Sequence, residues 1–152
     1  MASYERLSKK FQNILKTHGK DVYLRRRCLC DQSGPYQTYA DDCPDCGGTG
    51  FVQKIERHTM RMQLIGTQTA YISAMGLFET GIVLGEGNYF YCLGSVLPKY
   101  GDLIYDYAPS ENRYRCYQIE KALERRFDDR ILFYTCACNI KEEYSGTVSL
   151  PS

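Results

Sequence analysis

The sequence has no tryptophan, only two histidines and no run of 18 apolar residues. Without such a run we do not expect a membrane-spanning helix, and the polar start, MASYERLSKKF, lacks the apolar core of a signal peptide. We therefore expect an intracellular protein, in which the eight cysteines are thiols or metal ligands rather than disulfides. The length of 152 residues suits one domain with room for a small insert.

Recognisable catalytic motifs are missing as well. No Gly-rich loop joins a predicted strand to a predicted helix, and neither Gly-x-Ser-x-Gly nor His-Glu-x-x-His occurs, so the common nucleotide and hydrolase sites have no anchor. The acidic pairs Asp41-Asp42 and Asp128-Asp129 fall at turn signals, where aspartate is favoured for conformational reasons. We expect the protein not to be an enzyme.

Charge is nearly balanced overall but unevenly distributed. The net charge is +1, yet residues 1–30 hold eight basic and two acidic side chains, whereas the rest hold 11 basic and 16 acidic ones. A basic end on an acidic body favours docking between unlike surfaces. It is weaker evidence for nucleic acid, because there is no overall basic excess. The 14 tyrosines fit pleated sheets and protein interfaces.

Four cysteines stand close together as a Cys-x-Cys pair and a Cys-x-x-Cys pair that runs into a glycine-rich turn. Thiolates at such spacing suit tetrahedral Zn²⁺, and four filled positions indicate a structural rather than a catalytic ion. Disulfides, free thiols and a redox Cys-x-x-Cys are the alternatives. The predicted zinc ligands of this ribbon or knuckle are Cys28, Cys30, Cys43 and Cys46.

The letters CPDCGGTG, residues 43–50, resemble one Cys-x-x-Cys-x-Gly-x-Gly repeat of the cysteine-rich region of J-domain co-chaperones. Those proteins carry several such repeats and a J-domain, and neither is present here. The resemblance supports a zinc-binding turn. It also leaves a co-chaperone-like binder of unfolded chains as an alternative function.

The hydrophobic pattern predicts a mainly β (α+β) protein: a small antiparallel β-barrel, or else a sandwich, with an N-terminal helix and a zinc-ribbon insertion. Apolar residues recur at helical spacing over 3–18, between Ser3 as a cap and Gly19 at the end. Residues 121–125 suit either a helical turn or a long strand. The predicted strands are 51–59, 60–65, 68–73, 80–84, 89–93, 103–107, 114–119 and 131–140.

These elements divide the chain into four parts. They are a helix with a first extended segment (1–24), the zinc ribbon (25–51), the barrel body (52–143) and a loose tail (144–152). Four further cysteines fall on predicted strands and are read as small apolar core residues, with a second metal site as the alternative. These are Cys92, Cys116, Cys136 and Cys138.

The segment PKYGDLIYDYAPSENRYRCYQIEKALERRFDDRILFYTCACNI, residues 98–140, resembles the small β-barrel head-closure (stopper) and neck proteins of tailed bacteriophages. The N-terminal stretch with HGKDVYLRRR and the CPDC turn is similar to structural proteins of the virion neck. The resemblance implies that Gly101-Asp102 starts a barrel strand and that Tyr114–Ile119 pairs with it.

The resemblance further implies a structural protein that forms a ring between portal or adaptor and tail proteins, with genome DNA in the lumen. Its place would be the virion neck, and the host cytoplasm during assembly. A zinc-ribbon module that binds nucleic acid is a rival function. The arginines 25–27 also suit a solvated charge run or an offset to the zinc-thiolate charge. The expected partner contacts are Arg25, Arg26, Arg27, Met75, Leu77 and Phe78.

Overall fold

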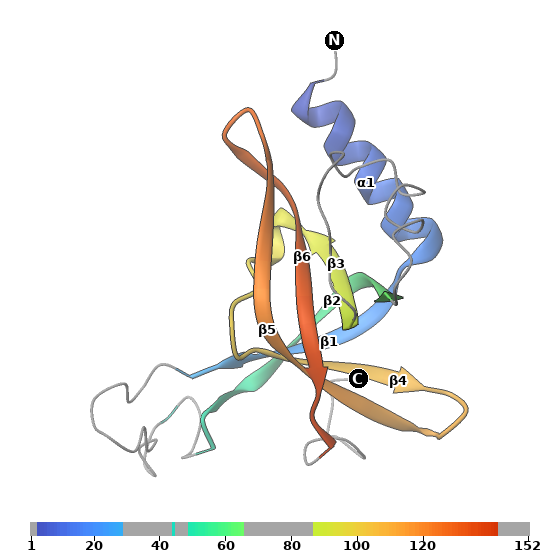
Figure 1. Cartoon of the computed structure of the whole chain (residues 1–152). Coiled ribbons are helices and arrows are strands. Elements are labelled where there is room, and N and C mark those ends of the chain that lie inside the picture. The colour runs from blue at the N-terminus through green and yellow to red at the C-terminus, as the bar shows by residue number, and fades with distance from the viewer. Residues whose placement is uncertain (1–2, 29–43, 45–48, 66–86, 143–152) are drawn as a thin grey trace.

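The computed structural model describes residues 3–28, 44, 49–65 and 87–142. Within them one helix precedes six strands, and these strands close into an antiparallel barrel in the order β1-β2-β3-β6-β5-β4 (Figure 1). The predicted β-barrel with an N-terminal helix is thereby confirmed. The elements are α1 (Tyr4–His18), β1 (Lys20–Arg27), β2 (Phe51–Ile65), β3 (Gly87–Leu93), the 3-10 turn η1 (Gly94–Val96), β4 (Leu103–Ala108), β5 (Arg113–Phe127) and β6 (Arg130–Ile140).

The barrel begins earlier in the chain than the sequence pattern indicated. Strand β1 pairs with β2 from Lys20↔Met60 to Arg27↔Phe51, and with β4 through Leu24↔Ile104. The first extended segment is therefore a barrel strand, and arginines 25–27 belong to it. Residues 51–65 form one continuous strand rather than two. The expected strands 68–73 and 80–84 lie outside the described residues.

The barrel interior is filled by apolar side chains from every strand. Val22 and Leu24 point inward from β1 with Tyr23 between them on the other face, as the two-residue period of a strand requires. A buried aliphatic or aromatic side chain of this kind contributes about 1.5–3 kcal/mol to folding. The interior cluster contains Val22, Leu24, Met60, Phe90, Cys92, Val96, Ile104, Tyr117, Ile119, Tyr134, Cys136 and Cys138.

Helix α1 covers part of the outside of the barrel (Figure 1). Phe11 is fully buried and stacks on Phe133 of β6, with ring centroids 4.5 Å apart. The Ser3 side chain accepts a hydrogen bond from the Arg6 backbone nitrogen at 3.2 Å, which confirms the predicted N-cap. Gly19 ends the helix in extended backbone, and a Cβ there would lie 2.4 Å from the Leu15 carbonyl oxygen.

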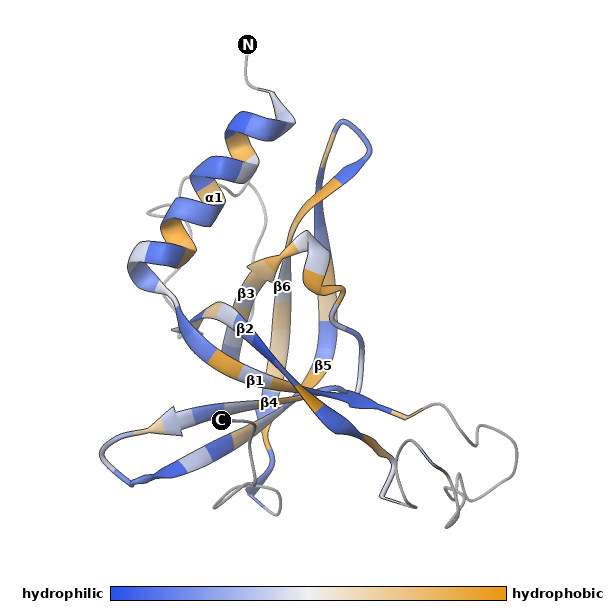
Figure 2. Ribbon diagram, turned by 180° about the vertical axis from the view of Figure 1, so that it is seen from behind, coloured by the Kyte–Doolittle hydropathy of each residue, from blue (hydrophilic) through white to orange (hydrophobic). Residues whose placement is uncertain are grey.

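Strands β5 and β6 form a long hairpin that runs past the barrel and alongside α1 (Figures 1 and 2). Asp128 and Asp129 turn the chain with φ of +51° and +62°, the left-handed conformation that aspartate tolerates better than most residues. Residues 121–125, which the sequence left undecided, are strand. The ladder shifts between Arg125 and Arg126. Leu132 packs in the cluster with Phe11 of α1, whereas Tyr134 lies inside the barrel.

The strand expected after Gly101-Asp102 is present, and so is its expected partner strand. Asp102 immediately precedes β4, and the Gly101 nitrogen and Ile119 oxygen are joined by a hydrogen bond of 2.8 Å. The Ile119 backbone nitrogen in turn donates to the backbone carbonyl oxygen of Asp102 at 2.9 Å. Strand β4 then pairs with β5 from Leu103↔Gln118 onward, so the expected pairing of these two strands is confirmed.

Candidate functional site

The connection from β3 to β4 folds against the end of β1 and leaves a pocket of about 360 Å³ between them. Strand β1 delivers two arginines to this pocket, and η1 with the following turn delivers the opposite wall. The two walls are about 70 residues apart in sequence, so only the closure of the barrel brings them together. The lining residues are Arg26, Arg27, Ser95, Val96, Leu97, Lys99, Tyr100 and Asp102.

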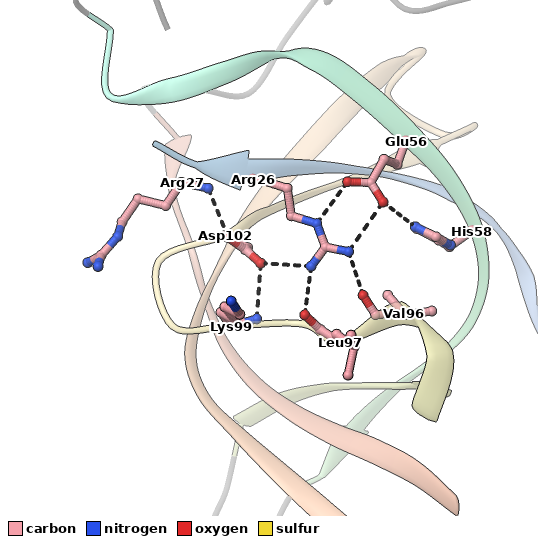
Figure 3. A network of polar contacts seen from close by, with 8 residues as sticks. All are labelled: Arg26, Arg27, Glu56, His58, Val96, Leu97, Lys99 and Asp102. Atoms are coloured by element: carbon pink, nitrogen blue, oxygen red, sulfur yellow. Dashed lines mark hydrogen bonds and ion pairs between the residues drawn. The ribbon is translucent and has the colours of Figure 1, made fainter. Parts of the chain in front are cut away.

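Arg26 ties three parts of the chain together at the floor of the pocket (Figure 3). Its guanidinium donates to both carboxylate oxygens of Glu56, at 2.8 and 3.2 Å, and to the Leu97 carbonyl at 2.8 Å. It also donates to the Val96 carbonyl and lies 3.4 Å from Asp102 Oδ2. Bidentate pairing of this kind is the strongest geometry available to a guanidinium. Arg26 is thus a positioning residue, and its charge is offset by two carboxylates.

The pKa of Glu56 reflects this network. Hydrogen bonds from Arg26 lower the pKa of the Glu56 carboxyl below its ordinary value of 4.5, against the opposing effect of partial burial. A smaller contribution comes from the His58 ring, whose Nε2 lies 3.0 Å from Glu56 Oε1. Glu56 is therefore ionised at neutral pH and remains available to hold Arg26.

Asp102 fixes the turn that carries the other wall of the pocket (Figure 3). Its buried carboxylate accepts hydrogen bonds from the backbone nitrogens of Arg27, at 2.9 Å, and Lys99, at 3.0 Å. Gly101 before it has φ +89°, and a Cβ there would lie 2.6 Å from Arg27 Cδ. Only glycine combines that backbone conformation with this close approach. The Gly-Asp pair therefore sets the shape of the pocket.

The exposed part of the pocket combines positive charge with apolar side chains. The Arg27 guanidinium lies over the Tyr100 ring, 5.5 Å from its centroid, and neither Arg27 nor Lys99 forms an ion pair within the described part of the chain. Tyr100 is 60% exposed and Leu97 51% exposed. Leu97 has φ +53°, an unusual conformation for leucine that turns its side chain away from the core.

This combination is typical of a docking surface. Exposed large apolar side chains are anchors in protein interfaces, and aromatic residues and arginine dominate the energetics of such sites. Four large hydrophobic residues of the described chain are strongly exposed, namely Leu97, Tyr100, Tyr107 and Ile140, and two of them border this one pocket. The pocket can hold an acidic or polar group on Arg27 and Lys99, with an apolar neighbour on Leu97 and Tyr100.

The three predicted arginine contacts have different environments. Arg25 donates from Nε to the Val52 carbonyl at 2.9 Å and lies over the Phe51 ring. Both Arg26 and Arg27 line the pocket, but Arg26 is paired with Glu56, whereas the Arg27 guanidinium lies over the Tyr100 ring. Contact of these arginines with a partner stays a prediction. Met75, Leu77 and Phe78, the other predicted contacts, lie outside the described residues.

The predicted zinc ligands fall mostly outside the described residues, which include Cys28 but not Cys30, Cys43 or Cys46. Cys28 is buried, and its backbone nitrogen donates to the Gly50 carbonyl at 2.8 Å. The two ends of the 28–50 segment are thereby held together, which fits a closed loop pinned by one ion. Among the described residues no group of three or more His, Cys, Asp or Glu is placed to hold a metal, so zinc stays a prediction.

The other cysteines are packed as core residues. Cys92, Cys136 and Cys138 lie inside the barrel, whereas Cys116 packs with Leu103 and Tyr105 in a separate cluster. A hydrogen bond with Cys92, together with burial, raises the pKa of the Cys136 thiol, and burial raises the pKa of Cys138. Buried thiols of this kind are protonated at neutral pH and pack as small apolar side chains.

Sequence reasoning singled out Arg26 and Arg27 but missed the wall of the pocket that faces them. The sequence marks Gly101-Asp102 as the start of a strand, but nothing in it marks Leu97, Lys99 or Tyr100 as exposed. The available signal was a tyrosine and a lysine at the centre of a turn, where smaller polar residues are usual. That signal alone does not reveal a pocket, because its other wall comes from β1.

Comparisons with known proteins identify no relative: no family model matches the chain, and no curated protein is significantly similar to it. Among the described residues, no helix is both long and apolar enough to cross a membrane.

Proposed function

We propose that this chain is a structural protein of the virion neck of a tailed bacteriophage, assembled as a ring between portal or adaptor and tail proteins. Its role would be head closure or head–tail connection, with genome DNA passing through the lumen. The observation that carries the proposal is the closed barrel in which β4 follows Gly101-Asp102 and pairs with β5. This is the arrangement that the resemblance in the sequence implied.

The surface of the barrel supports a role in assembly. Around the closed barrel the strands pair with one another, so a partner there must contact side chains and loops, or else bind the hairpin that projects beyond the barrel. The pocket at Arg27 and Tyr100 offers such a contact, and the long β5–β6 hairpin offers a projecting element.

The 28–50 segment leaves the barrel beside the same pocket, because Cys28 directly follows Arg27 and pairs with Gly50. If this segment holds Zn²⁺ on Cys28, Cys30, Cys43 and Cys46, the ion supplies the folding energy that so short a loop lacks.

The decisive experiment is mass spectrometry of particles purified from the phage that encodes the chain, on density gradients. We expect the wild-type protein in the particles at a constant ratio to the portal protein. A Leu97→Asp variant should be made by the cell but should not be incorporated into particles. Aspartate tolerates the positive φ at this position, so folding should be retained. Ile140→Asp is the matched control, because Ile140 is also exposed but does not line the pocket.

Absence of the wild-type chain from purified particles would rule out the proposal. The two rival functions have distinct signatures in the same preparations. Suppression of aggregation of an unfolded client, without incorporation into particles, would indicate the co-chaperone-like binder. Sequence-selective nucleic-acid binding that is lost when zinc is chelated would indicate a zinc-ribbon module.

A further inference from the structure

The outward face of α1 carries a line of positive charge, which we call the α1 stripe: Arg6, Lys9, Lys10 and Lys16. All four side chains are exposed. With about 3.6 residues per turn, they fall within about a third of the helix circumference. The opposite face is the one that buries Phe11 and Leu15 on the barrel, so the stripe points directly away from the body of the protein.

Within the described part of the chain the stripe is not neutralised by ion pairs, although Glu5 stands four residues before Lys9. None of its four members forms an ion pair within the described residues, and the one acid of α1, Glu5, is 3.1 Å from Arg130 of β6. Arg6 stands three and four residues before Lys9 and Lys10, a spacing at which like charges destabilise a helix by a few tenths of a kcal/mol per pair. An anionic partner would relieve this repulsion.

The surroundings of the stripe favour phosphate over a protein surface. The strongly exposed large hydrophobic residues of the described chain all lie elsewhere, so this face lacks the apolar anchors on which protein interfaces depend. It has instead a hollow of about 510 Å³, and the described residues that line it are Arg6, Leu7, Lys9, Lys10 and Asn13. Cationic and amide side chains are the usual donors to phosphate oxygens.

The length of the stripe suits a nucleic-acid backbone. From Arg6 to Lys16 the helix rises by about 15 Å, which matches about four phosphates of one strand at about 3.4 Å per nucleotide along the DNA axis. We propose that the α1 stripe binds the phosphate backbone of duplex DNA without reading its sequence. The inference goes beyond the proposed function, because it is a property of the single chain and does not require a ring.

The test is fluorescence anisotropy with a labelled 20-base-pair duplex, titrated with purified full-length protein between 50 and 200 mM salt. Four phosphate contacts predict a slope of log affinity against log salt of about −3.6, or about a 150-fold loss over this range. Lys9→Gln/Lys10→Gln should reduce the slope by about 1.8. Lys54→Gln/Lys121→Gln is the matched control: it removes the same charge from exposed strand positions and should leave the slope unchanged.

Three results would overturn the inference. The first is no salt-dependent binding by the wild type at 50 mM salt. The second is an equal loss in both double variants, which would show a general charge effect. The third is tight binding of poly-L-glutamate that depends on Lys9 and Lys10, without DNA binding, which would indicate an acidic protein partner. Circular dichroism checks that each variant is folded. None of these results bears on incorporation into particles, which is measured separately.

Discussion

The two cationic surfaces of this protein differ in what surrounds the charge. At the pocket, Arg26 is locked by Glu56 and Asp102, and Arg27 rests on the Tyr100 ring beside exposed Leu97. On α1 the basic side chains are exposed, form no ion pair within the described residues and have no large exposed apolar neighbour among them. The comparison teaches that a basic segment in a sequence does not define a partner: fixed cations with apolar neighbours suit a protein, and unanchored ones suit phosphate.

If the pocket is held by its polar network, the largest effect should come from Asp102→Ala. This change leaves the Arg27 and Lys99 backbone nitrogens and part of Arg26 without their acceptor. Breaking a buried charge pair by removing one partner costs about 3–5 kcal/mol, and we expect a loss near the lower value in urea unfolding. Asp21→Ala is the control, because the Asp21–Arg57 pair is exposed and should matter little. Equal effects would show that the network does not hold the pocket.

A smaller effect is expected from Gly101→Ala. The added Cβ meets Arg27 Cδ, and φ of +89° disfavours any side chain. We expect a loss of about 1–2 kcal/mol in the same unfolding assay, with Arg27 displaced from the Tyr100 ring. Gly87→Ala is the comparison for the close contact. Gly87 also has a positive φ, of +152°, but the nearest atom to an added Cβ there is 3.7 Å away. A Gly101→Ala protein as stable as the wild type would contradict the close packing described for the pocket.

The pH dependence of stability tests whether Glu56 holds Arg26 at the pocket. The folded-state pKa of Glu56 lies below its ordinary value of 4.5 because of Arg26. The ionised carboxylate therefore stabilises the folded state above that value, and this contribution is lost as pH falls through the folded pKa. Glu56→Gln should flatten the stability profile below pH about 4.5, whereas Glu120→Gln, at an exposed position, should not. Thermal melting from pH 7 to pH 3 measures both, and parallel profiles would refute this role of Glu56.

The smallest effect is expected on α1. Lys9→Gln/Lys10→Gln removes two like charges spaced from Arg6 as described above, so stability should rise by a few tenths of a kcal/mol. Differential scanning calorimetry at low salt measures the change, and it should shrink at high salt because exposed charges are screened. A clear loss of stability would mean that Lys9 and Lys10 form stabilising contacts in the folded protein.

The sequence predicted more of the fold than of the site. Local signals sufficed for α1, because Ser3, Gly19 and the apolar spacing all lie within one segment. Residues 121–125 were ambiguous, since Lys-Ala-Leu-Glu-Arg favours helix by propensity, and pairing with β6 decides the outcome. The pocket could not be predicted in this way. Its walls, at Arg26 and at Leu97, meet only after the barrel closes.

Site-specific photo-cross-linking from position 100 tests the proposed docking surface most directly. A benzophenone amino acid replaces Tyr100, which is exposed at the pocket, and particles assembled with this protein are irradiated. We predict one dominant adduct with a virion protein or a second copy of the chain, and no such adduct from position 107, which is also exposed but lies outside the pocket lining. Incorporated protein that gives no adduct from position 100, or equal adducts from both positions, would contradict the assignment of this pocket as the contact.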